Sequence, residues 1–319
     1  MKKGQILTLL SVIAIGFLIV ATGCRKNREF RKENGQTSED NSNTLSQADQ
    51  GVSDANTAIG NYSSMSGRYA QLPSVLATIC GATIDTTGMS TGTLMINYDG
   101  TVCNNRKREG SIRLTIQNFA SGVKWKDAGC VLKVDYIAYK VTRASDGKFL
   151  QFDGTHLVTN VSGGTWVDLV LGLKSSLVHT VNASGPLTVA FDDGKTATCN
   201  LNRKFTYTWG NSILTCTGEG TGSYNSLTNL ENYGTTRDGD DFTSQVSTYV
   251  IWNTTCGAWA PIQGEVNIAV ASKSFSMVCT FGVDQTGTPV TVAPNTCAYG
   301  WKLYWKYKKK DKTKIFPYQ

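Results

Sequence analysis

From about residue 79 onward, apolar and polar residues alternate along most of the chain with a period of two. Such alternation is typical of β-strands with one buried face and one face toward solvent. The clearest runs are Ile112, Leu114 and Ile116; Leu132, Val134, Tyr136 and Ala138; Leu187, Val189 and Phe191; Phe205, Tyr207 and Trp209; and Val266, Ile268 and Val270. We therefore expect an all-β body.

Asp-Gly pairs punctuate this body, and they favour tight hairpin turns because glycine and aspartate tolerate positive φ. They fall at residues 99–100, 146–147, 153–154, 193–194 and 238–239. No helical pattern stands out after residue 65, so the pattern predicts an antiparallel meander of hairpins. A sandwich, a half-barrel and a long curved sheet all remain open.

Before the body, a helical stripe predicts one short N-terminal helix over residues 44–62. Its apolar positions are spaced 3, 4, 3 and 4: Leu45, Ala48, Val52, Ala55 and Ile59. Gly51 weakens this helix by about 1 kcal/mol relative to alanine. We expect the helix to pack on the body or on a partner chain.

The chain begins with Met1-Lys2-Lys3, an apolar run over residues 6–20, and Ala21-Thr22-Gly23-Cys24. A run of fifteen mostly apolar residues suits a secretory signal better than a membrane span, which needs about twenty. Small residues before a cysteine resemble the lipobox of bacterial lipoproteins, although Ala21 stands where that family prefers leucine. The resemblance implies that residues 1–23 are a signal peptide cleaved before Cys24. It also implies that acylated Cys24 anchors the protein to a lipid bilayer.

After Cys24, residues 24–43 are almost entirely polar and are interpreted as a tether. Some Bacteroidetes-type lipoproteins, which the chain resembles in outline, carry an acidic export signal at this point. Here Arg25, Lys26 and Arg28 are basic instead. We therefore expect a cell-envelope protein on the outer membrane that faces the periplasm. The body is divided into residues 66–240 and a C-terminal β segment, residues 241–319.

The chain has 319 residues and a formal net charge of +7, but this charge is unevenly distributed. Residues 302–314 hold seven lysines against Asp311, whereas residues 41–301 carry a net charge of −2. A nucleic-acid-binding protein usually has a basic stripe across its folded face. We therefore expect no nucleic-acid partner, and consider an envelope glycan or another envelope protein instead.

Eight cysteines remain once Cys24 is set aside, an even number that suits an exported disulfide protein. They are Cys80, Cys103, Cys130, Cys199, Cys216, Cys256, Cys279 and Cys297. No two lie closer than 17 positions, whereas zinc sites use close pairs. We expect disulfides and no metal. Spacing alone leaves the connectivity open, with Cys199–Cys216 and Cys279–Cys297 as the preferred local pairs.

Residues suited to catalysis are sparse. The two histidines, His156 and His179, lie in apolar strand patterns and are interpreted as core residues. The aspartates at 192–193 and 238–241 lack a calcium-loop spacing and suit ordinary turns. We therefore expect no catalytic residue and no cofactor.

The C-terminal segment from Trp301 to Lys310 alternates aromatic residues with lysines. It suits a terminal strand whose lysines prevent edge pairing. The alternatives are a belt at anionic lipid headgroups, or tryptophans that stack on sugars. Trp301, Trp305 and Lys306 are the candidate ligand or headgroup contacts.

These observations favour a membrane-anchored envelope lipoprotein with a non-enzymatic structural or binding role. A carbohydrate- or lipid-binding β-sheet module is the first alternative. An envelope hydrolase is the second, and it would require a histidine placed beside a carboxylate.

Overall fold

The computed structural model describes residues 35–67, 78–257, 260–273, 275–291, 296–307 and 310–318. Within them the all-β prediction is confirmed, because one antiparallel sheet of 16 strands makes up the body. Its main path runs β1-β2-β3-β4-β5-β6-β8-β11-β12-β13-β14-β15-β16, and β7, β9 and β10 pair beside it. The sheet continues from β11 into β12 at residue 241.

The strands are β1 Ala82–Asp85, β2 Thr93–Cys103, β3 Arg106–Ile116, β4 Cys130–Arg143, β5 Phe149–Asn160, β6 Leu177–Ala183, β7 Leu187–Phe191, β8 Thr196–Gly210, β9 Ile213–Gly220, β10 Gly222–Tyr224, β11 Leu227–Thr235, β12 Asp241–Asn253, β13 Gln263–Val270, β14 Phe275–Val283, β15 Gly300–Tyr307 and β16 Lys310–Pro317. Two short helices, α2 Ser63–Ser66 and α3 Trp166–Val170, and three single 3-10 turns connect them: η1 Met89–Thr91, η2 Phe119–Ser121 and η3 Ala271–Lys273.

Three of the Asp-Gly pairs form hairpin turns as predicted, at 146–147, 193–194 and 238–239. The other two lie inside β2 and β5, where the prediction of a turn was wrong. Gly100 has φ +84° beside a register shift between β2 and β3, so its positive φ serves a β-bulge. Asn-Asn and Asn-Ser pairs supply tight turns instead, with positive φ at both residues: 104–105, 211–212 and 225–226.

A long helix covers residues 35–60, so it starts well before the predicted residue 44. Residues 35–43, predicted as tether, are helical although they are polar. Side-chain hydrogen bonds one turn apart support such a polar helix, as between Gln36 Nε2 and Asp40 Oδ1 at 2.8 Å. Residues 44–60 belong to one compact unit with the strands, named here the β body (residues 44–319).

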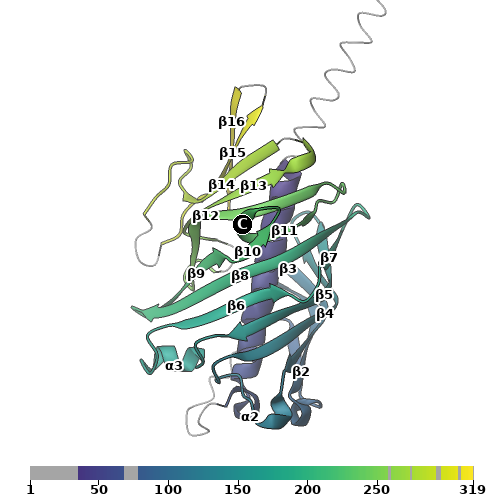
Figure 1. Cartoon of the computed structure of the whole chain (residues 1–319), viewed down its shortest axis with the longest axis vertical. Coiled ribbons are helices and arrows are strands. Elements are labelled where there is room, and N and C mark those ends of the chain that lie inside the picture. Colours follow the sequence, from purple (N-terminus) through teal and green to yellow (C-terminus); the bar gives the residue numbers. More distant parts are fainter. Residues whose placement is uncertain are drawn as a thin grey trace, which may run out of the picture. The chain divides into compact units, whose positions relative to one another are not determined.

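Within the β body most of this helix is buried, and one face, which includes Gln50, Ser53 and Thr57, is half-buried. The predicted apolar stripe is confirmed, with Leu45, Ala48, Val52, Ala55 and Ile59 all buried. The polar residues Gln47, Asp54 and Asn56, on other faces, are buried as well. Strands β6 and β8 pass across the helix in Figure 1. The sheet therefore curves around the helix instead of forming a two-sheet sandwich.

Among the residues that the structure describes, two disulfides are present, Cys80–Cys103 and Cys256–Cys297. The preferred pairs were wrong. Cys216 lies opposite Tyr207 on β8, eight residues beyond Cys199, which is roughly 26 Å along a strand. Cys130, Cys199, Cys216 and Cys279 form no disulfide. Burial raises the pKa of Cys130 and Cys199 to about 12, so both remain protonated thiols at neutral pH.

The C-terminal segment forms the hairpin β15–β16, with β16 at the edge of the sheet. Trp301 and Leu303 point into the body and are buried, whereas Lys306 is exposed. Lys312 and Lys314 lie on β16 itself. Lysine on an edge strand discourages pairing with another chain.

At Gly51 the helix lies close to β4. A Cβ placed on it would lie 2.9 Å from the hydroxyl of Tyr136, a buried side chain. Glycine therefore lets the helix sit against the sheet at the cost of helix propensity.

We expect Gly51→Ala to destabilise the protein by about 1 kcal/mol or more despite its gain in helix propensity, because the added methyl group overpacks the core. Gly60→Ala is the matched control, since nothing lies within 4 Å of its added Cβ. Urea unfolding of both variants measures the difference. Equal or greater stability of Gly51→Ala relative to wild type would contradict this account of the contact.

Candidate functional site

A pocket of about 300 Å³ opens in the β body between the helix and one side of the sheet. The helix lines it with residues from Asp49 to Ser53, β8 with Phe205 and Tyr207, and β9 with Leu214 and Cys216. Trp166 of α3, the segment from Trp252 to Thr254, and Asn104 complete most of its wall. Because Asn104 is in the β2–β3 turn, strands far apart in the sheet meet here. The pocket thus depends on the curvature of the sheet.

A buried ion pair joins the helix to the sheet at this pocket. Arg203 Nη1 on β8 donates to Asp49 Oδ1 at 2.5 Å, and its Nε lies 3.7 Å from Glu231 Oε2 on β11. Burial raises the pKa of both acids, and the Arg203 charge opposes the shift. One guanidinium therefore faces two acidic side chains, and its charge favours their ionised forms against the effect of burial.

Aromatic rings form the wall of the pocket beside this ion pair. The Arg203 guanidinium carbon lies 4.7 Å from the centre of the Phe205 ring and 5.4 Å from that of Trp252. Trp252 in turn packs on Gly218 of β9, where an added Cβ would be 2.7 Å from its ring. Gly218 therefore sets how deeply this indole can sit.

Each disulfide lies next to a lining residue of the pocket. Cys103 precedes Asn104 on one side, and Cys256 precedes Gly257 on the other. A cross-link beside each loop limits its freedom in the folded protein. The two bridges therefore restrain two separate segments of the wall.

The predicted contact residues lie outside this wall. Trp301 is buried against Phe316, with ring centres 4.3 Å apart. Trp305 is half-buried opposite Met277 and Lys312, and Lys306 lies opposite Asp311. Sequence reasoning missed Asp49, Trp166, Arg203 and Trp252. Their spacing carries no signal, because they come from four separate elements.

Both histidines lie in the core, as the sequence predicted, with exposed fractions of 0% for His156 and 1% for His179. The rings of Trp125 and Tyr207 each lie 5.2 Å from that of His179. Neither histidine donates to or accepts from a described carboxylate. Burial lowers the pKa of each to about 4, so both are neutral at pH 7.

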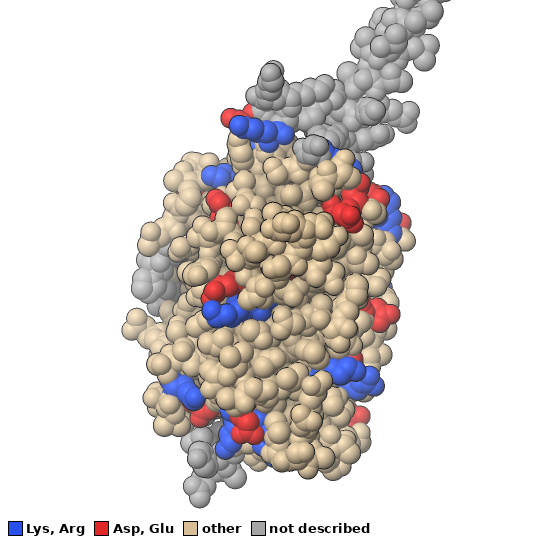
Figure 2. All heavy atoms as spheres, in the orientation of Figure 1, with Lys and Arg blue, Asp and Glu red and all other residues tan. Residues whose placement is uncertain are grey.

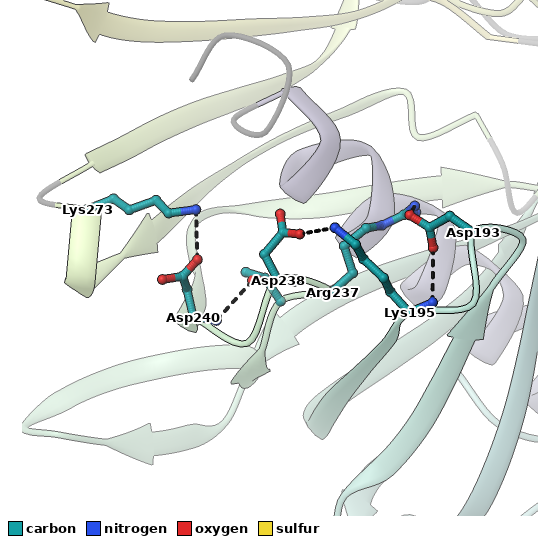
Figure 3. Close-up of polar contacts among 7 residues, drawn as sticks. Asp193, Lys195, Arg237, Asp238, Asp240 and Lys273 are labelled. Carbon is teal, nitrogen blue, oxygen red and sulfur yellow. Dashed lines mark hydrogen bonds and ion pairs between the residues drawn. The ribbon is translucent and has the colours of Figure 1, made fainter. Parts of the chain in front are cut away.

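The two aspartate-rich turns, 192–193 and 238–241, come together on the surface (Figure 3). Their carboxylates pair with neighbouring cations: Asp193 with Arg237 at 3.0 Å, Asp238 with Lys195 at 2.5 Å and Asp240 with Lys273 at 2.7 Å. Hydrogen bonds from Lys273 and Ser272 hold the pKa of Asp240 below its usual range. Within the described ranges no three His, Cys, Asp or Glu side chains form a group able to hold a metal ion.

The scan against protein-family models finds no matching family, and the searches of curated proteins and of solved structures find no match either. In the part of the chain that the structure describes, no helix is both long and apolar enough to cross a membrane. The two disulfides point to an oxidising, exported environment. The proposed anchor Cys24 and the signal peptide lie outside the described residues.

Lowering the pH should destabilise the protein through its buried histidines. Their pKa is about 6.5 when unfolded and about 4 when folded, so only the unfolded chain gains these protons as the pH falls below 6.5. Between pH 7 and 5 each histidine removes about 2 kcal/mol of stability. His179→Phe should remove one such contribution.

Urea unfolding of wild type and His179→Phe at pH 7 and pH 5 measures this difference. The buried carboxylates titrate in both proteins, so comparing the two pH-dependent losses isolates His179. An equal loss in both proteins would mean that His179 is not held neutral by burial.

Proposed function

We propose that this chain is a non-enzymatic, exported binding protein of the cell envelope, which takes a small ligand in the pocket between the helix and the sheet. The observation that carries the proposal is the pocket itself. It is concave, its exposed lining is mostly apolar, and six aromatic or aliphatic side chains line it together with six polar ones. Ligand sites in proteins have this composition.

Anchoring through acylated Cys24, on the outer membrane and facing the periplasm, belongs to the same proposal. It is supported by the lipobox-like Ala21-Thr22-Gly23-Cys24 and by the disulfides. A hydrolase is disfavoured because both histidines are buried and neither hydrogen-bonds to a described carboxylate. On the face shown in Figure 2, acidic and basic side chains lie close together in small groups, which favours a partner other than nucleic acid.

A screen of neutral small molecules by thermal shift tests the binding role. The library should contain sugars, alcohols, aromatic compounds and short-chain lipids. Compounds that raise the Tm of the wild type should lose this effect in Leu214→Trp, which fills the pocket with a larger ring. Trp209→Ala is the control, because Trp209 is 37% exposed and lies outside the pocket. The proposal is wrong if no compound acts, or if compounds act equally on Leu214→Trp.

Acyl-chain labelling with membrane fractionation tests the anchor. Wild-type protein should carry the label and sediment with membranes, whereas Cys24→Ala should be unlabelled and released, because it lacks the acylated thiol. Cys216→Ala, which alters a cysteine in the β body, should behave like wild type. An unlabelled wild type, or a Cys24→Ala protein that stays in the membrane fraction, would contradict anchoring at this residue.

A further inference from the structure

We infer that the ligand of the pocket is a neutral carbohydrate, a monosaccharide or one ring of a glycan. This inference rests on the proposed binding function and names its ligand class. Three features of the pocket carry it: charges of both signs already paired beside it, the indole rings on its wall, and the mixture of hydrogen-bond donors and acceptors on that wall.

The charges already present disfavour an ionic ligand. A cationic ligand would seek the carboxylate of Asp49 and the aromatic rings, but Arg203 already pairs with that carboxylate and lies over Phe205 and Trp252. An anionic ligand would seek Arg203, but Asp49 and Glu231 already face its guanidinium. A cation would therefore lie close to the like charge of Arg203, and an anion close to the like charge of Asp49, which is costly away from bulk water.

The aromatic rings suit a flat, partly apolar ligand. Trp166 and Trp252 are only half-buried although both line the pocket, so part of each indole is open to it. Trp166 also packs against Tyr207, with ring centres 6.1 Å apart. Indole rings combine a large apolar face with little conformational freedom, so ordering a ligand on them costs little entropy. The apolar C–H face of a sugar ring matches such a surface.

The polar groups on the wall suit hydroxyl groups. Thr254 Oγ1 accepts the Leu214 N–H at 3.2 Å and keeps its own proton for donation. Gln50 donates Nε2 to Asp54 at 2.6 Å and keeps its carbonyl oxygen as an acceptor. Asp49 uses Oδ1 for Arg203 and retains a second carboxylate oxygen. A hydroxyl both donates and accepts, so it can pair with either kind of group, whereas an acyl chain would leave them all without a partner.

Isothermal titration calorimetry at pH 7 with matched sugars tests this ligand class. N-acetylglucosamine should bind about tenfold or more tightly than glucosamine, whose amine is charged, and glucose about tenfold or more tightly than glucuronate. Trp252→Ala should weaken binding of the neutral sugar about tenfold. Gly218→Ala, which shifts the Trp252 indole but keeps it, should weaken binding too. Trp209→Ala should bind like wild type.

Each outcome has a distinct meaning. Neutral sugars that bind with the expected dependence on Trp252 and Gly218 support the inference, and the second variant covers a failure of Trp252→Ala to fold. If the charged sugars bind as tightly, or if Trp252→Ala and Gly218→Ala both bind normally, the inference is wrong. If the neutral library binds in the pocket through compounds other than sugars, only the ligand class is wrong. If no compound binds, the proposed function fails with it.

Discussion

The structure depends on ion pairs that hold one helix inside a curved sheet. Asp49 pairs with Arg203 on β8, and Asp54 with Arg108 on β3 at 2.5 Å, where Tyr98 adds a hydrogen bond of 2.6 Å. Removing such charges from water is costly, and an unpaired one would cost several kcal/mol more. If the helix moved by one turn along its axis or rotated about it, both ion pairs would separate at once. The apolar stripe favours burial of the helix against the sheet, and the two ion pairs select one position for it. Gly51, which has no side chain, lets the helix come close enough to the sheet to take that position.

The same position of the helix explains how a single sheet can curve so far. An open sheet of this length leaves one face of every strand in need of cover, and here buried residues of β2, β3, β4, β5 and β8 share one cluster with the helix. The helix also forms one side of the pocket through residues 49–53. The pocket is therefore a consequence of seating the helix, and any change that loosens the helix would alter the pocket.

The sequence predicted the fold class because period-two patterning is a local property. The alternating pattern correctly predicted the buried faces of β3, β7 and β13. The prediction failed at Ala138, where a bulge with φ +48° moves the buried positions to Tyr139 and Val141. The helical stripe was equally visible, but Asp49 and Asp54 look like solvent-facing residues when their partners lie 154 and 54 positions away. The disulfides failed for a related reason. Cys256 and Cys297 meet only because β13 and β14 form a hairpin between them, so proximity along the sequence favoured the wrong partners.

The candidate pocket could not be predicted because no single segment contains it, and a buried residue behind its wall serves both the fold and the pocket. Arg203 pairs with two acids, which serves the fold, and its guanidinium lies over Phe205 and Trp252 in the pocket wall. The charge that holds the helix in place thus also pairs with Asp49, the carboxylate that lines the pocket. If the ion pair were replaced by apolar residues, the helix could still be buried. The pocket wall would then lose the carboxylate of Asp49, and the rings of Phe205 and Trp252 would lose the guanidinium beside them. The same ion pair therefore stabilises the position of the helix and sets the polarity of the pocket wall.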